Sequence, residues 1–288
     1  MPLKDVKYKY NQTILKVYGY GDNKKIKVLK LRCLRTAGIE DESEFKSAKC
    51  TVNDEKLAEN IARAKSKIFE LAFCNPWQYF FTATLSSEKY NRMDLSKFHK
   101  DLTQFLRDTG KKYGTKIAFL LIPELHEDGK SWHMHGFLHG VPEKELQQFV
   151  IGNKMGKVLA EKVKNGEKVY NWLSYQKKFG YCSLEPVRNH EAVSKYVTKY
   201  INKNLAKSVK ELNAHLYYRS RGLNTAKTIK KGTMLADIVP DYESEYCSIT
   251  WFDYDEQLLK QLKENLISID YYKTRKPVKS IVVNCSQL

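Results

Sequence analysis

Two apolar segments joined by a turn signal constrain this chain most, because together they predict a β-hairpin in its middle. Residues 116–124 (KIAFLLIPE) and 132–140 (WHMHGFLHG) have the apolar composition of buried strands. Asp128-Gly129 between them is a strong signal for a two-residue turn. Residues at equal distances from this turn then pair, so Glu124 lies directly opposite His133. A longer loop would weaken this register.

Three potential metal ligands meet on one face of the predicted hairpin. His133 and His135 are two positions apart in a strand, so their side chains point the same way, and Glu124 shares that face. Two imidazoles and one carboxylate predict a divalent metal site with positions left for water or phosphate oxygens. His126 and His139 fall on the same face. They are left outside the ligand set, as spare ligands, phosphate contacts or surface residues.

The remaining patterns predict an α+β fold with a central, mostly antiparallel sheet and flanking helices packed on one face. Residues 151–180 form an insertion without clear periodicity. Gly110 is expected to end one of the helices. The further strands are expected at 13–20, 25–34, 77–86, 181–187, 214–219 and 246–252, and the helices at 53–75, 94–109, 141–150, 190–205 and 254–267.

Charge points to a polyanionic partner. The 288 residues carry a net charge of +17, which favours nucleic acid first and an anionic membrane surface second. Nineteen tyrosines and twelve phenylalanines suit single strands, whose bases stack on aromatic rings. The chain has no apolar run long enough to span a membrane and no ATP-binding G-x-x-x-x-G-K-[ST] motif. Its six scattered cysteines indicate reduced thiols in a cytoplasm.

A tyrosine pair lies in the helix predicted at 190–205. Tyr196 and Tyr200 are four apart and are expected to lie one above the other on one helix face. A phenol is a weak nucleophile at neutral pH unless a metal, a base or a cation assists it. Lys199 and Lys203 are the candidate cations. These four residues are therefore predicted to be catalytic.

Together these motifs resemble the HUH endonucleases. The run 80–86 (FFTATLS) is similar to the first motif of that superfamily, the His133–His135 pair with Glu124 to its second, and residues 196–203 (YVTKYINK) to its two-tyrosine third motif. The likeness spans roughly residues 75–225 and is greatest to rolling-circle replication initiators of bacterial phages and plasmids. The expected domains are a basic N-terminal region of unassigned role (1–75), the endonuclease domain (76–225) and a C-terminal strand–helix segment (226–288) that packs on it.

The resemblance implies a palm similar to the RNA-recognition fold and a mechanism. Mg²⁺ or Mn²⁺ bound by Glu124, His133 and His135 would activate a scissile phosphate of single-stranded origin DNA. A tyrosine would attack it and form a 5′-phosphotyrosine link; Tyr200 is preferred as the first nucleophile, and the order stays open. Without an ATP motif, a host helicase and a host polymerase are the implied partners, in the cytoplasm of a bacterial cell.

Several alternatives remain at this point. A transposase or conjugative relaxase would use the same chemistry, although relaxases usually place their tyrosines before the histidines. A nucleotide hydrolase of the histidine-triad type would need a third histidine where Phe137 stands. In a non-catalytic single-strand DNA-binding protein, the histidines and tyrosines would only pack and stack.

Overall fold

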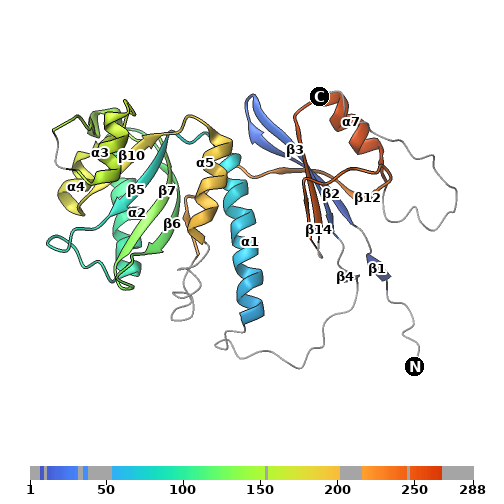
Figure 1. Ribbon diagram of the computed structural model, residues 1–288, viewed down its shortest axis with the longest axis horizontal. Coiled ribbons are helices and arrows are strands. Elements are labelled where there is room, and N and C mark those ends of the chain that lie inside the picture. The colour runs from blue at the N-terminus through green and yellow to red at the C-terminus, as the bar shows by residue number, and fades with distance from the viewer. Residues whose placement is uncertain are drawn as a thin grey trace. The chain divides into compact units, whose positions relative to one another are not determined.

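A computed structural model shows a chain that divides into two compact units (Figure 1). Unit 1 combines Met1–Thr51 with Thr225–Leu288, and unit 2 is Val52–Asn224. The C-terminal segment, expected to pack on the endonuclease-like domain, instead pairs with strands of the N-terminal region. The structure describes residues 7–9, 12–31, 35–37, 54–152, 155–201, 216–244 and 247–267.

Unit 2 is built on a seven-stranded sheet in which every pair of neighbouring strands is antiparallel. This arrangement confirms the predicted α+β class. In spatial order the strands are β11 (Tyr218–Arg219), β6 (Ala118–Leu125), β7 (Trp132–His139), β5 (Tyr79–Thr84), β10 (Cys182–Pro186), β9 (Tyr170–Trp172) and β8 (Leu146–Gln148). The hairpin of β6 and β7 lies between β11 and β5.

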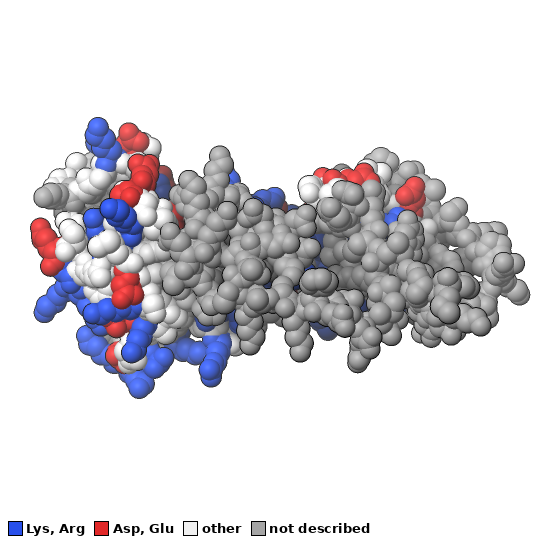
Figure 2. Space-filling view, turned by 90° about the horizontal axis from the view of Figure 1, so that it is seen from below, with Lys and Arg blue, Asp and Glu red and all other residues white. Residues whose placement is uncertain are grey.

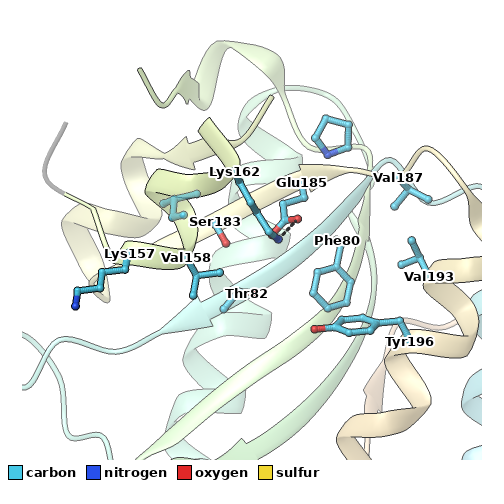
Figure 3. A pocket seen from close by; sticks show the side chains of 13 residues that line it. Phe80, Thr82, Lys157, Val158, Lys162, Ser183, Glu185, Val187, Val193 and Tyr196 are labelled. Atoms are coloured by element: carbon cyan, nitrogen blue, oxygen red, sulfur yellow. Dashed lines mark hydrogen bonds and ion pairs between the residues drawn. The ribbon is translucent and has the colours of Figure 1, made fainter. Parts of the chain in front are cut away.

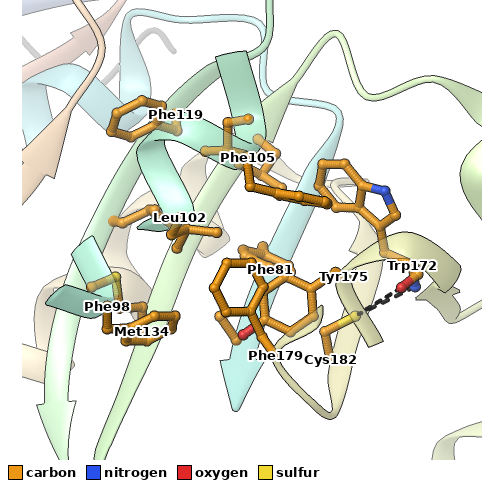
Figure 4. Packing of buried hydrophobic residues seen from close by; sticks show 14 of the residues in the cluster. Phe81, Phe98, Leu102, Phe105, Phe119, Met134, Trp172, Tyr175, Phe179 and Cys182 are labelled. Carbon is orange, nitrogen blue, oxygen red and sulfur yellow. Dashed lines mark hydrogen bonds between the residues drawn. The ribbon is translucent and has the colours of Figure 1, made fainter. Parts of the chain in front are cut away.

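Helices cover both faces of this sheet, whereas the sequence analysis expected them on one face. Helices α2 (Leu95–Lys112) and α4 (Leu173–Lys178) pack on one face through an aromatic-rich core that includes Phe81, Phe98 and Tyr175 (Figure 4). On the other face, α1 (Asp54–Phe73) and α5 (His190–Val197) bury a second cluster against Phe80, Leu120 and Phe137. Strand residues alternate between the faces, and both apolar sets need cover.

Local differences from the expected elements have identifiable causes. Helix α2 continues past Gly110 to Lys112, so Gly110 does not end the helix. Its missing side chain instead leaves room for the backbone carbonyl of Thr115. The helix expected at 141–150 is only the 3-10 turn η1 (Glu143–Glu145) followed by β8, which pairs with β9. The insertion at 151–180 contains α3 (Lys157–Lys164), β9 and α4.

In its described residues, unit 1 has a second antiparallel sheet of six strands with one helix on it. The strands expected at 13–20 and 25–34 are present as β2 (Thr13–Tyr20) and β3 (Asn23–Leu31), which form a hairpin with Gly21-Asp22 at its turn. Helix α7 (Glu256–Glu264) buries Leu262 against Leu15 and Ile26. The other strands are β12 (Lys227–Met234), which the sequence analysis missed, β13 (Tyr242–Glu243), β14 (Cys247–Asp253) and β15 (Leu266–Ile267); β1 (Lys7–Lys9) and β4 (Arg35–Ala37) form a separate pair.

Among the described residues, no helix has the length and apolar character needed to cross a membrane.

Candidate active site

The β6–β7 hairpin has the predicted register, although its loop is longer than predicted. Glu124 pairs with His133. The backbone N–H of His126 donates to the carbonyl of Ser131 at 2.7 Å, so four residues rather than two lie in the loop. The two additional residues are divided equally between the two strand ends. The register is therefore unchanged, and Glu124 stays opposite His133.

The loop is fixed by the side chain of Asp128. Its carboxylate accepts the backbone N–H groups of Lys130 and Ser131, each at 2.8 Å, and the hydroxyl of Ser131 at 2.5 Å. These hydrogen bonds hold the pKa of Asp128 well below its usual range. Gly129 has φ of 68°, a conformation that glycine adopts without strain. The turn signal in the sequence thus acts through a side-chain-stabilised loop.

His133 and His135 lie on one face of β7, and each is oriented by a threonine of β5. Nδ1 of His135 is 3.3 Å from the hydroxyl oxygen of Thr82, and Nδ1 of His133 is 3.2 Å from that of Thr84. Nε2 of His135 is 2.9 Å from Oε2 of Glu124. A threonine bound to one ring nitrogen fixes the ring and directs the other nitrogen outward. The sequence analysis missed this role, although the alternation in 80–86 places both hydroxyls on the histidine face.

His133 is uncharged at neutral pH. Burial lowers its pKa to about 4, and the neighbouring His126 and His135 contribute to the same shift. The ring of His126 stacks on that of His133 with centroids 4.7 Å apart, whereas His135 lies 6.2 Å from His133. His139 is six positions along the strand, roughly 20 Å from His133. The structure thus brings His126 to the site and leaves His139 away from it.

Glu124, His133 and His135 carry donor atoms of the kinds that bind a divalent ion, but a hydrogen bond and ring stacking set their present spacing. Neutral imidazoles and a carboxylate are the ligand types that Mn²⁺ and similar ions accept. Within the described part of the chain, no three His, Cys, Asp or Glu side chains are grouped closely enough to hold a metal. Glu124 contacts His135, and His133 stacks on His126. The metal site therefore stays a prediction that rests on ligand chemistry and register.

Helix α5 places Tyr196 beside this face of the sheet. Val197 is fully buried and docks the helix, while Tyr196 is 46 % exposed. The Tyr196 ring lies 5.7 Å from the ring of Phe80, which in turn stacks on His135 at 6.4 Å. Phe80 thus connects the tyrosine helix with the histidine pair. The ammonium group of Lys199 lies 5.6 Å from the centre of the Tyr196 ring, the cation–π geometry of a neighbouring cation.

The second tyrosine follows a change in helix type. The α-helix ends at Val197, and Tyr200 belongs to the 3-10 turn η2 (Thr198–Ile201). The Thr198 hydroxyl donates to the carbonyl of Lys195 at 2.7 Å, a local bond that competes with α-helical pairing. The expectation that Tyr196 and Tyr200 lie one above the other on one helix face concerns a side chain outside the described residues, so it stays a prediction. The side chain of Tyr200 and all of Lys203 lie outside the described residues.

Two cavities border the same threonines. One of about 530 Å³ is lined by Phe80, Thr82 and Tyr196 (Figure 3), and another of about 440 Å³ by Thr82 and Thr84. Helix α3, which the sequence analysis did not foresee, contributes Leu159 to both cavities. Beside the first cavity, the ammonium group of Lys162 lies 2.6 Å from a Glu185 carboxylate oxygen. A concave surface therefore leads from α3 to the threonines that contact the histidines.

The region that contains the candidate site is similar to a known protein family. The family model of the replication-associated protein ORF2/G2P matches residues 78–205. The matched segment lies within unit 2 and contains Glu124, the histidine pair and both tyrosines. No curated protein and no solved structure matches the chain. The family match supports a role in DNA replication for this chain.

Proposed function

We propose that this protein is a rolling-circle replication initiator that nicks and rejoins single-stranded origin DNA. Four features support the proposal: the match to a replication-associated family, the pairing of Glu124 with the histidine strand, the threonine-oriented imidazoles, and a tyrosine helix on the same sheet face. The observation that carries it is the contact series from Tyr196 through Phe80 to His135. This series supports the proposal, because a tyrosine and a candidate metal ligand would then act on the same surface.

In the proposed reaction, the phenolic oxygen of a tyrosine attacks the scissile phosphorus. The bond between phosphorus and the 3′ oxygen breaks, the phenol loses its proton, and the leaving oxygen gains one. The products are a 5′-phosphotyrosine and a free 3′-hydroxyl from which a host polymerase extends. Attack by a DNA 3′-hydroxyl on the phosphotyrosine reverses the step and rejoins the strand. No external energy source is needed, because one phosphoester replaces another.

Each residue of the candidate site has a separate role in the proposed reaction. Glu124, His133 and His135 would hold Mg²⁺ or Mn²⁺, which would polarise the phosphate and stabilise its developing charge. Lys199 lies where a cation can favour a Tyr196 phenolate. The two cavities beside Thr82 would receive the unpaired nucleotides that flank the scissile phosphate. Tyr200 and Lys203 complete the proposed set by the two-tyrosine pattern of the sequence.

The proposal includes a cellular setting. We expect the protein to act in the cytoplasm of a bacterial cell, with a host helicase opening the duplex ahead of the polymerase. A transposase or relaxase would leave the same covalent link. Such an enzyme would differ by joining the cleaved end to a second DNA rather than resealing a circle.

The test is formation of a covalent adduct on labelled random-sequence single strands and stem-loops in the presence of Mn²⁺. We expect an adduct that EDTA abolishes and that the double variant Tyr196→Phe/Tyr200→Phe cannot form. Tyr242→Phe, an exposed tyrosine of unit 1, is the matched control and should form it normally. The single tyrosine variants report which residue acts first. Normal DNA binding without any adduct in the unmodified protein would replace the enzyme with a passive single-strand binder.

A further inference from the structure

A strongly basic groove lies at another part of unit 2, away from the histidine site. It encloses about 800 Å³ between the C-terminal turn of α2, the loop before β6, and β11. Five of its lining side chains carry a positive charge: Arg107, Lys111, Lys116, Arg219 and Arg221. All five are exposed. Among the described residues that line it, none is Asp or Glu.

The fold holds these cations in place. Gly110 allows the chain after α2 to turn back closely, since a side chain there would meet the backbone of Thr115 at 2.6 Å. On the opposite wall, the N–H of Ser220 donates to the carbonyl of Phe119 at 3.0 Å, and the N–H of Phe119 donates to the Ser220 hydroxyl at 3.1 Å. Arg219 and Arg221 therefore flank a residue that is tied to β6 by two hydrogen bonds.

The groove is separate from the candidate active site. Lys116 lies before the start of β6 and Glu124 near its end, roughly 25 Å apart along a strand. Leu106 and Phe119, which line the groove, belong to the aromatic-rich core cluster under α2. The histidines lie on the opposite face of the sheet. A nucleotide bound at the histidines cannot fill both places. Figure 2 shows Lys and Arg side chains gathered along the lower edge of unit 2, at the left of that view.

The lining favours the phosphate backbone over unpaired bases. Proteins that hold single strands combine cations with exposed aromatic rings on which bases stack. The aromatic residue that lines this groove, Phe119, is only 7 % exposed. Arginine and lysine side chains bind phosphate oxygens without the help of aromatic rings. They can therefore contact duplex DNA without reaching a base.

We propose that this groove binds the phosphate backbone of duplex DNA. The inference goes beyond the nicking function, because it requires neither the metal nor a tyrosine. In the proposed initiator, such a groove would hold a double-stranded segment while the opposite sheet face holds the single strand. The protein would then engage both kinds of DNA at once.

The experiment measures binding of a mixed-sequence duplex of 20 base pairs by the full chain in EDTA, over a range of salt concentrations. We expect Arg107→Gln/Arg219→Gln/Arg221→Gln to lose about tenfold or more in affinity at low salt. The slope of log affinity against log salt should fall by about 2 to 3, since each lost phosphate contact releases about one counterion fewer. All three residues are exposed, so the variant should melt at the temperature of the unmodified protein.

Matched variants separate the groove from overall charge. Lys144→Gln/Lys164→Gln/Lys168→Gln removes three exposed cations of unit 2 that line neither the groove nor the cavities near the histidines, and it should bind the duplex nearly normally. Replacing the three groove arginines by lysine should preserve most of the affinity. Single-strand binding and adduct formation should persist in the glutamine variant. Three results would each overturn the proposal. They are unchanged duplex binding in the glutamine variant of the groove, an equal loss in the Lys144/Lys164/Lys168 control variant, and an equal loss of single-strand binding in the groove variant.

Discussion

Phe81 is fully buried on the sheet face that α2 covers, whereas its neighbour Thr82, on the other face, is half-buried and bonds to His135. The same alternation repeats along β7, where Met134 is fully buried and His135 is half-buried. At these positions one face contributes to the core under α2, whereas the other carries polar groups next to open cavities, beside the second apolar cluster that α1 and α5 cover. A sheet can tolerate a partly desolvated polar face when its opposite face holds the strands together.

This comparison predicts that core variants and site variants have separable effects. The largest effect on stability should come from Phe98→Ala in α2, on the sheet face that this helix covers. Phe98 is fully buried and packs against Tyr90 and Phe179, with ring centroids 6.1 and 6.0 Å away. We expect a loss of about 3–5 kcal/mol in the free energy of unfolding, measured by denaturant titration. A loss below about 1 kcal/mol would show that this face does not carry the stability of unit 2.

Gly136→Ala should have the next largest effect, because Gly136 lies against the backbone of the neighbouring strand β6. A side chain at Gly136 would meet the backbone carbonyl of Leu120 on the neighbouring strand. We expect a destabilisation of about 1–3 kcal/mol by overpacking. Gly156→Ala is the control, since a side chain there meets nothing within 4 Å. Equal melting temperatures for the two variants would contradict the close approach.

Thr82→Val should change metal binding rather than stability. The variant keeps the shape of the side chain but removes the hydroxyl that orients His135. We expect Mn²⁺ affinity to fall by about 10–100-fold, as for other groups that support a ligating histidine. Isothermal titration calorimetry measures this loss, and Thr228→Val in unit 1 serves as the control. An unchanged affinity would mean that the threonine contact has no part in metal binding.

The smallest effect is expected from Asp128→Ala in the hairpin loop, and it should depend on pH. Hydrogen bonds hold the pKa of Asp128 below that of the unfolded chain, so its carboxylate stabilises the fold above about pH 4. That contribution declines progressively below this value and is lost only as the pH falls through the pKa of the folded state. The melting temperature of the variant should therefore lie below that of the unmodified protein at pH 7, and the difference should shrink as the pH is lowered from about 4 toward 2. A difference that does not change with pH would contradict the role of the charge.

The sequence predicted the central hairpin because its signals are local. Apolar alternation and Asp128-Gly129 lie within one continuous segment, and the register follows from the position of the turn. The pairing of Glu124 with His133 was predicted despite a longer loop, because that loop is symmetric about the same point. The helix ahead of the sheet, α1, and the strands β2 and β3 of unit 1 were also predicted from local patterns.

What the sequence did not predict depends on contacts between distant segments. Strand β12 contains three lysines and a glycine, and its pairing with β2 and β15 identifies it as a strand. Glu145 lies in a segment with a helical pattern, but its carboxylate accepts hydrogen bonds from Tyr113 at 2.7 Å and from Lys112 at 3.1 Å. The orienting role of Thr82 required knowledge that β5 and β7 are neighbours. Long-range pairing of this kind leaves little trace in a single sequence.

Mn²⁺ binding by the unmodified protein and by Glu124→Gln tests the central claim most directly. If Glu124, His133 and His135 form a metal site, calorimetry should show one Mn²⁺ bound per chain, with affinity reduced about tenfold or more in the variant. Glu127→Gln, which alters an exposed loop carboxylate nearby, should bind Mn²⁺ normally. Equal affinity in Glu124→Gln and in the unmodified protein would contradict the account, as would the absence of binding to either.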